Sequence, residues 1–289
     1  MGLFVIELSS QKWHVAHGRS IELGLKSVIM AIVNVTPDSF SDGGHYEAVD
    51  AAVAHALACV EASADIVDIG GESTKPGAAA VNASEEQGRV LPVIEALRGK
   101  TDALISIDTY RADTARLAIG AGAHIVNDVF GLQREADIAV VAAHTGAGLC
   151  IMHTGRDRHK LSDVIDDQFV FLNRSLDIAA AAGVDRRNIV LDPGFGFAKE
   201  SAEENLELMA RFNALLRFDL PLLVGTSRKR FVGTITGRDA ADRDVGTAAT
   251  SAILRLQGAA LFRVHNVAIN RDALAVADAI LKTRARLKA

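Results

Sequence analysis

The chain has 289 residues, a formal net charge of −5 and 49% hydrophobic residues. Its length suits one α/β barrel, since such barrels commonly occupy ~250 residues, and its many Ala, Val, Ile and Leu residues favour a parallel sheet covered by helices over a β-sandwich. The mild acidity excludes a general nucleic-acid-binding surface, which needs a basic face, and no run of about 18 apolar residues is present to span a membrane. The N-terminus contains Glu7 and no basic segment, which is atypical of a signal peptide, so we expect a cytoplasmic protein without a nucleic-acid or membrane partner.

Eight apolar runs rich in β-branched residues alternate along the chain with longer amphipathic stretches. The runs cover residues 28–33, 64–69, 103–108, 124–129, 148–153, 188–193, 220–225 and 260–265. Helical periodicity follows each run, over residues 46–63, 85–98, 111–122, 135–146, 161–183, 202–217, 244–258 and 270–288. Alternation of this kind is typical of repeated βα units. We therefore predict a (β/α)8 TIM barrel that occupies residues 1–289 as a single domain, with residues 1–20 as a short N-terminal extension.

Polar side chains stand at or near the ends of all eight predicted strands. In chain order they are Asn34, the segment 68–78 (DIGGESTKPGA), Asp108, Asn127 with Asp128, His153, Asp192, Ser227 with Arg228 and Lys229, and Arg263 with His265. One such residue has a simple alternative explanation, because Asp and Asn commonly cap the following helix. A buried ring of eight polar ends is costly unless ligands or mutual hydrogen bonds satisfy it. The ring therefore predicts a binding site on the loops that follow the strands.

The chemical types of these residues divide the predicted site into two halves. Asp108, Asn127 and Asp192 offer acceptors and an amide, which suit a flat heterocycle with several N–H donors. Arg263, His265 and Asn34 offer cationic and amide donors near the last and first strands, where barrels commonly bind phosphate. The sequence thus predicts a heterocycle on one side and an anion on the other.

Three adjacent cations follow the seventh strand in the segment GTSRKRFVG. Side chains splay apart where a strand gives way to a helix, so the three cannot all point into one pocket. We expect Lys229 to reach inward and Ser227, with the helix N-terminus that follows, to hold a carboxylate. Arg228 and Arg230 are expected to pack the loop or lie at the surface. The alternative is that all three cations form one solvated run.

Several segments carry a resemblance to a known family. AIVNVTPDSFSDGG and DIGGESTKPGA resemble the two signature segments of the dihydropteroate synthase family of pterin-binding barrels, and SIDT, VNDV, LDPGFGFAK, GTSRKRFVG and RVHNV follow in that family's order. The resemblance runs from about Met30 to Val267. It implies condensation of 6-hydroxymethyl-7,8-dihydropterin diphosphate with p-aminobenzoate, with Mg2+ as cofactor, by a homodimeric enzyme that sulfonamides target as p-aminobenzoate mimics.

The resemblance also implies roles for single residues. Those that would hold the pterin are Asp108, Asn127, Asp192 and Lys229. Arg263, His265 and Asn34 would face the diphosphate, and Asn34 would also bind Mg2+. Phe197 and Ser227 would flank p-aminobenzoate. Asp42 and Thr74 would be the functional residues of two mobile loops that exclude water, and Asp42, Lys229, Arg263 and His265 would be the catalytic residues.

Two positions depart from the family's pattern or stay ambiguous. Lys75 stands where the family usually has Arg, which replaces a planar bidentate donor with a point charge. His153 is either a site residue or a buried histidine whose hydrogen bonds are satisfied. Two other functions also remain open: a pterin-binding domain that passes a methyl group to a corrinoid protein, and a catalytically silent binding module. Neither has a reason to keep the complete diphosphate set of Asn34, Arg263 and His265, which this chain has.

Overall fold

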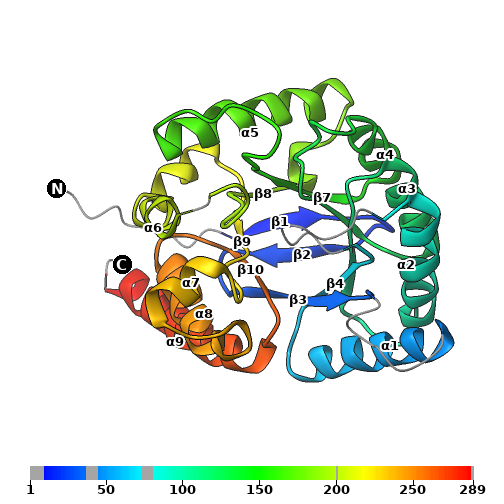
Figure 1. Cartoon of the computed structure of the whole chain (residues 1–289), viewed down its shortest axis with the longest axis horizontal. Helices are drawn as coiled ribbons and strands as arrows, with labels where there is room; N and C mark the ends of the chain where they lie inside the picture. The colour runs from blue at the N-terminus through cyan, green and yellow to red at the C-terminus, as the bar shows by residue number, and fades with distance from the viewer. Residues whose placement is uncertain (1–9, 37–44, 73–80, 200, 288–289) are drawn as a thin grey trace.

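A (β/α)8 barrel forms the body of the protein, as the sequence predicts (Figure 1). The computed structural model describes residues 10–36, 45–72, 81–199 and 201–287. The eight parallel strands are β3 (Val28–Asn34), β4 (Ile66–Gly70), β5 (Leu104–Asp108), β6 (Ile125–Asp128), β7 (Gly148–Met152), β8 (Ile189–Asp192), β9 (Leu223–Val224) and β10 (Leu261–Val264). They are paired in the order β8-β7-β6-β5-β4-β3-β10-β9. A single parallel bridge between Leu191 and Leu222 joins the two ends of this sheet and closes the barrel.

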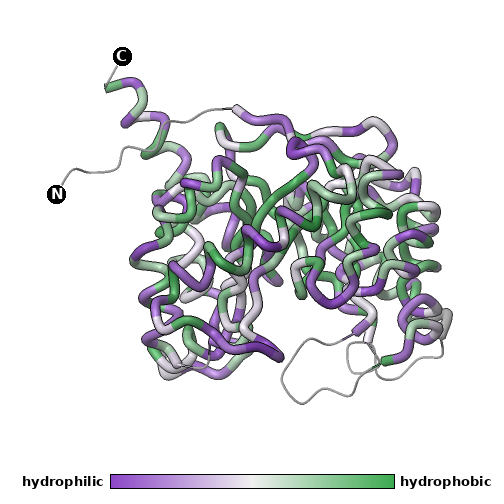
Figure 2. Tube along the Cα trace, turned by 90° about the horizontal axis from the view of Figure 1, so that it is seen from above, coloured by the Kyte–Doolittle hydropathy of each residue, from purple (hydrophilic) through white to green (hydrophobic). Residues whose placement is uncertain are grey.

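Helices surround the barrel on its outside (Figure 1). They are α1 (His45–Glu61), α2 (Ala83–Leu97), α3 (Ala112–Ala121), α4 (Asp137–Thr145), α5 (Val164–Ala181), α6 (Ala202–Ala210), α7 (Arg230–Thr236), α8 (Asp244–Leu256) and α9 (Val267–Arg286), with short 3-10 turns at η2 (Arg186–Asn188), η3 (Phe212–Phe218) and η4 (Ala240–Asp242). In Figure 2 hydrophobic and hydrophilic residues alternate along these helices, as expected when one face of each packs on the barrel. Among the described helices none is long and apolar enough to cross a membrane.

An N-terminal hairpin lies across one end of the barrel (Figure 1). Its antiparallel strands are β1 (Gln11–His14) and β2 (Ser20–Leu23), so it runs three residues past the predicted extension of residues 1–20. Trp13 is 1% exposed, packs with the apolar interior of the barrel, and donates from Nε1 to the main-chain oxygen of Asn188 at 2.7 Å. Gly148 allows this approach, because a Cβ there would lie 2.7 Å from Val15 and 3.0 Å from the indole. The hairpin therefore closes the N-terminal end of the barrel.

The inside of the barrel changes from apolar to polar along the strands. Near the hairpin, inward side chains form one buried apolar cluster that includes Ile66, Leu104, Ile125, Val190 and Leu261. Side chains of a strand return to the same face every second residue, so the next inward positions are two residues further on. These positions carry Asp68, Ser106, Asn127, Asp192 and Arg263, which we call the polar layer. The polar layer therefore lies on the C-terminal side of the apolar cluster.

Candidate active site

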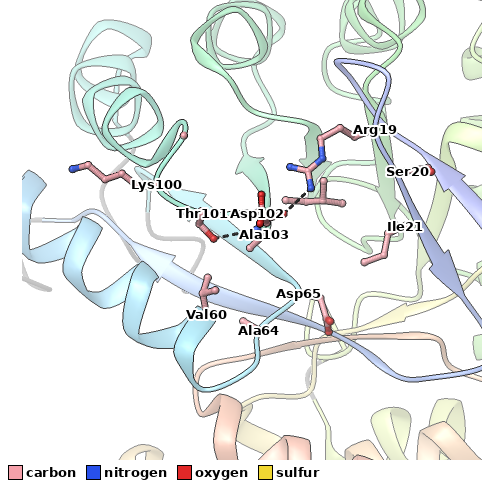
Figure 3. Close-up of a pocket in the computed structure, with 12 residues that line it drawn as sticks. Arg19, Ser20, Ile21, Val60, Ala64, Asp65, Lys100, Thr101, Asp102 and Ala103 are labelled. Atoms are coloured by element: carbon pink, nitrogen blue, oxygen red, sulfur yellow. Dashed lines mark hydrogen bonds between the residues drawn. The ribbon is translucent and has the colours of Figure 1, made fainter.

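A cavity of about 690 Å3 lies between the hairpin and the loops that precede β4 and β5 (Figure 3). Two of its charged side chains are engaged within the protein. Arg19 donates to the main-chain oxygen of Asp102 at 2.7 Å, and Asp65 forms an ion pair with Arg271 at 2.6 Å. Because the cavity is at the N-terminal ends of the strands, it lies away from the C-terminal ends where (β/α)8 enzymes place their chemistry. The polar layer is the better candidate site.

Arg263 is the centre of the polar layer. From β10 its Nε donates to Asp68 Oδ2 at 2.6 Å, and its Nη2 donates to Asp108 Oδ2 at 2.7 Å. Asn127 donates from Nδ2 to the same Asp68 oxygen at 3.1 Å. Burial lowers the pKa of Arg263, but the Asp68 and Asp108 carboxylates outweigh that effect, so its pKa is raised and the guanidinium stays charged. Burial also disfavours the charged form of Asp108. It therefore raises the pKa of that carboxyl group, while the charge of Arg263 opposes the rise.

Asp68 begins the polar segment 68–78, but reasoning from the sequence gave it no role in the site. It lies inside β4, two residues before the strand ends, and its exposure is 0%. Its other oxygen, Oδ1, and the hydroxyl of Ser106, its partner in strand register, are buried without a hydrogen-bond partner among the described residues. A charged residue at an inward position of an otherwise apolar strand was the signal that could have identified it. The polar layer is thus larger than the ring of strand ends.

Asp192, Lys229 and Phe197 lie near one another at the C-terminal ends of β8 and β9. Asp192 is 4% exposed, and its Oδ1 accepts from the N–H of Gly194 at 2.7 Å. Burial raises the pKa of Asp192 to about 6, against the opposing effects of the Gly194 N–H and of Lys229. The Lys229 ammonium lies 4.0 Å from the centroid of the Phe197 ring, and burial lowers its pKa to about 8. An acid, an amine and an aromatic ring therefore lie close together, of which Phe197 was implied by the family resemblance alone.

Phe197 belongs to a small apolar cluster, which we call the apolar wall. Buried side chains from the ends of three strands and the loop after β8 form a separate small cluster: Tyr110, Val129, Met152 and Phe197. The rings of Tyr110 and Phe130 pack edge to face with centroids 5.2 Å apart. Such a wall beside a few convergent polar groups is typical of a small-molecule site.

Ser227 and His265 are bonded to each other. Ser227 Oγ lies 2.9 Å from His265 Nδ1 and accepts from the main-chain N–H of His265 at 3.1 Å. Burial, followed by the field of Arg263, lowers the pKa of His265 to about 3. The lowered pKa favours the neutral imidazole, so of the donors grouped at this end of the site Arg263 is the one that carries a charge.

Arg228 points away from the site. It adopts a left-handed backbone conformation (φ 56°), and its guanidinium makes two bonds to Asp244 of α8, at 2.7 and 2.9 Å. Lys229, the next residue, ends in the buried space beside Phe197 instead. Arg230, the first residue of α7, is exposed. The three adjacent cations thus diverge, as the sequence predicts.

Asn34 lies at the mouth of the barrel next to Asp108. A Cβ on Gly70, the residue between them in strand register, would be 3.7 Å from Asn34 Oδ1 and 3.7 Å from Asp108 Oδ2. An amide oxygen in this place suits a hard cation such as Mg2+, but only as one ligand of several. Among the described residues no group of three or more His, Cys, Asp or Glu side chains could hold a metal ion. Asp42, Thr74 and Lys75 lie outside the described residues.

His153 is buried with both ring nitrogens paired. Nε2 lies 2.9 Å from Asp167 Oδ2, and Nδ1 lies 3.1 Å from the ammonium of Lys199. Its exposure is 1%. The structure therefore agrees with the interpretation of His153 as a histidine satisfied within the protein.

Comparison with known proteins identifies the family. Residues 30–265 match the family described as pterin binding enzyme. The chain is 41% identical over 265 residues to the dihydropteroate synthase of Clostridium beijerinckii, covering 91% of this chain and 98% of that one. The chain belongs to the dihydropteroate synthase family. The synthase of Bacillus subtilis is 43% identical over 242 residues, covering 84% of each chain.

Solved structures of dihydropteroate synthases share the fold. The Xanthomonas albilineans synthase, solved with 4-aminobenzoic acid, is 41% identical with a TM-score of 0.87 and covers 93% of this chain and 98% of its own. The Yersinia pestis synthase, solved in a sulfonamide drug complex, is 38% identical with a TM-score of 0.85 and covers 93% and 99%. These relatives favour a synthase over the corrinoid methyltransferase alternative.

Proposed function

We propose that this protein condenses 6-hydroxymethyl-7,8-dihydropterin diphosphate with p-aminobenzoate to give 7,8-dihydropteroate and diphosphate. The observation that carries the proposal is the group formed by the buried Asp192 and the partly buried Lys229 and Arg263 at the C-terminal ends of the strands, in a chain of this family. The reaction is an alkyl transfer to an arylamine, which makes the protein a transferase. We place it in the cytoplasm, where folate precursors are made.

The pterin would lie against Asp192, Asn127 and Lys229. A carboxylate accepts two parallel N–H bonds from a guanidinium-like edge, and the 2-amino and N3 edge of a pterin has this shape. Asp192 has one oxygen bonded to Gly194, which fixes the orientation of the carboxylate. Asp108 would face the same ligand from β5, and Phe197 with the apolar wall would cover the ring of p-aminobenzoate.

The diphosphate would face Arg263, His265 and Asn34. Arg263 donates from Nε to Asp68 and from Nη2 to Asp108. Its Nη1 has no hydrogen-bond partner among the described residues. His265 would donate as a neutral imidazole. Asn34 would hold Mg2+, which when bound would neutralise charge on the leaving diphosphate. Asp42 and Thr74 would complete this end from the first two loops.

The geometry suits a reaction in which the bond to diphosphate breaks early. The C–O electron pair leaves with the diphosphate, and the carbon cation is stabilised by the electron-rich dihydropterin. The amine nitrogen then forms the C–N bond and loses a proton to solvent, so no strong base is needed. Asp108 and Asp192 favour the positive pterin electrostatically, while the buried Phe197 and Met152 limit the access of water.

A diphosphate-release assay with and without p-aminobenzoate tests the proposal. Release that depends on p-aminobenzoate, with one dihydropteroate formed per diphosphate, is the expected result. Release that is the same without the amine would indicate a hydrolase. No release in the presence of Mg2+, together with bound pterin, would indicate the silent binding module. Repeating the assay with a chelator tests the metal, because activity should fall and return when Mg2+ is restored.

Ser227→Ala is expected to raise the Michaelis constant for p-aminobenzoate by about tenfold with little change in turnover. The carboxylate of p-aminobenzoate is remote from the reacting amine, so its contact is similar in the ground and transition states. Steady-state kinetics measure both constants. Ser175→Ala is the matched control, since that buried hydroxyl bonds to Phe171 on α5. A fall in turnover without a change in the Michaelis constant would contradict the assignment.

We also propose a homodimer formed through α7, α8 and α9. These helices lie side by side in Figure 1, and they carry exposed large apolar side chains, namely Ile235, Val245, Ile253, Val276 and Ile280. Contiguous apolar surface on a soluble protein commonly marks a protein interface. Sedimentation velocity at micromolar concentration should show a species of twice the chain mass, and a purely monomeric species would contradict the proposal.

A further inference from the structure

Lys199 is a buried cation in the loop between β8 and α6. It is 4% exposed, and its ammonium donates to the main-chain oxygen of Gly194 at 2.9 Å and to His153 Nδ1 at 3.1 Å. Among the described residues no carboxylate forms an ion pair with it. Burying an ammonium without such a partner costs several kcal/mol. Because this burial lowers stability, we look for a functional role of the Lys199 ammonium.

A hydrogen-bonded chain connects Lys199 to helix α5. His153 Nδ1 faces the Lys199 ammonium, and its Nε2 lies 2.9 Å from Asp167 Oδ2 and 2.9 Å from Arg158 Nη2. Asp167 also accepts from Arg158 Nη1 at 2.9 Å. Burial lowers the pKa of His153 to about 3, which favours the neutral ring. His153 therefore links Lys199 on one side to Asp167 and Arg158 on the other.

The other Lys199 contact is with the main-chain oxygen of Gly194, which lies in a tight turn after β8. Gly194 has a left-handed conformation (φ 64°), its oxygen accepts from Lys199 and from the N–H of Phe197, and its own N–H donates to Asp192. A Cβ on Gly194 would lie 2.0 Å from the main-chain oxygen of His153, so the turn is packed against β7. Lys199 thus holds the turn that bonds to Asp192 and that carries the Phe197 ring.

We propose that Lys199, oriented by His153 and Asp167, is a positioning residue for pterin binding: it fixes the Gly194 turn so that Asp192 is held as an ionised carboxylate facing the ligand. This inference rests on the proposed function and names a residue that acts through Gly194 without touching the substrate. Residues that orient a binding group in this way typically change affinity by about tenfold or more when removed. The larger effect should fall on the pterin, with a smaller loss of p-aminobenzoate affinity because the same turn carries Phe197.

The charges around Asp192 predict how pterin affinity depends on pH. Burial raises the pKa of Asp192, whereas the Gly194 N–H, Lys229, Arg263 and Lys199 lower it. Cys150 faces Asp192 from β7 as a thiol whose pKa burial raises, so it adds no charge. Removing Lys199 should therefore raise the pKa of Asp192 further. Because the pterin requires the carboxylate, affinity should be lost at a higher pH as the solution is acidified.

Lys199 has its own set of charged neighbours. Burial lowers its pKa to about 7, and Asp192, Glu204 and Asp167 oppose this while Lys160 adds to it. His153 is neutral and contributes a hydrogen bond only. Lys199 is therefore protonated below about pH 7, in the range where Asp192 begins to take up its proton. The effect of Lys199 on pterin affinity should therefore be clearest below pH 7.

The test compares Lys199→Met with the unchanged protein by calorimetric titration of 6-hydroxymethylpterin, which lacks the diphosphate, between pH 5 and 8. We expect the dissociation constant at pH 7 to rise about tenfold and the loss of affinity in acid, near pH 6 in the unchanged protein, to move to higher pH. The Michaelis constant for p-aminobenzoate should rise by a smaller factor than the pterin dissociation constant. In an Asp192→Asn background the same substitution should add less than about twofold, because the carboxylate it acts on is gone.

Two controls separate positioning from simple stability. Arg255→Met removes another buried cation, which pairs with Asp278 at the hairpin end of the barrel, and should lower the melting temperature without changing pterin affinity. Lys199→Gln keeps an N–H donor for Gly194 without the charge, so it should fold even if Lys199→Met does not, and should still show the shift in pH. Unchanged affinity and an unchanged pH profile in a folded Lys199 variant would overturn the inference. Failure of the unchanged protein to bind the pterin would refute the proposed function instead.

Discussion

Lys229→Ala is expected to lower turnover by at least ~100-fold, since it removes a charged contact of ~3 kcal/mol from a site that holds little water. The ammonium lies beside the Phe197 ring, and Asp192 raises its pKa while burial and Arg263 lower it. It is therefore the cation best placed to bond to a pterin held by Asp192. Steady-state turnover at saturating substrates is the measurement.

The pH dependence and a neighbouring residue provide controls for Lys229. Its pKa is lowered to about 8, so the ammonium loses its proton as pH rises through that value, and turnover should fall there. Arg228→Ala should cost far less, because that guanidinium bonds to Asp244 outside the site. An Arg228 variant more impaired than the Lys229 variant would overturn the assignment of the two cations.

Arg263→Ala is expected to lower the free energy of unfolding by about 3–5 kcal/mol, because it leaves buried carboxylates without their cation. Asp68 and Asp108 both depend on this guanidinium. Arg263 is paired with Asp108, which would face the pterin, so affinity for both the diphosphate and the pterin should fall. Urea unfolding and calorimetric titration with diphosphate and with 6-hydroxymethylpterin measure the two effects.

Arg255→Ala is the matched control for Arg263. It breaks an ion pair with Asp278 at the opposite end of the barrel, in which Arg255 is 2% exposed against 19% for Arg263. Stability should fall as well, while both ligands bind with unchanged affinity. If Arg263→Ala retained full stability and pterin affinity, the central position of Arg263 in the polar layer would be wrong.

The barrel was predictable because its signal repeats. All eight apolar runs became strands in a single parallel ring, since each run is long enough to cross the barrel and each is followed by helical periodicity. Two local features were not predictable. The first is the end of the hairpin at Leu23. Its second strand has only four residues and is mostly exposed, so the sequence carries little signal for it. Helix α7 has seven residues, too few to show a period.

Site residues that end a strand were predictable from the sequence. Ion pairs and protonation states were less predictable, because they depend on burial and on contacts between distant residues. Asp108, Asn127, Asp192 and Lys229 converge as expected, because parallel strands bring their carboxyl ends together. The Arg263 pairs were not predictable, since Asp108 and Asp68 are 155 and 195 residues earlier in the chain. The neutral state of His265 depends on burial and on Arg263, neither of which a sequence displays.

The N-terminal hairpin gives the protein an internal optical reporter. Trp13 is the only tryptophan in the sequence, and it sits against the apolar interior of the barrel with its indole N–H bonded to Asn188. Emission from a tryptophan shielded from water lies at shorter wavelength than emission from a solvated one. Fluorescence should therefore shift to the red when urea opens the hairpin end of the barrel. Because the polar layer is at the other end, pterin binding should leave the wavelength of this emission unchanged.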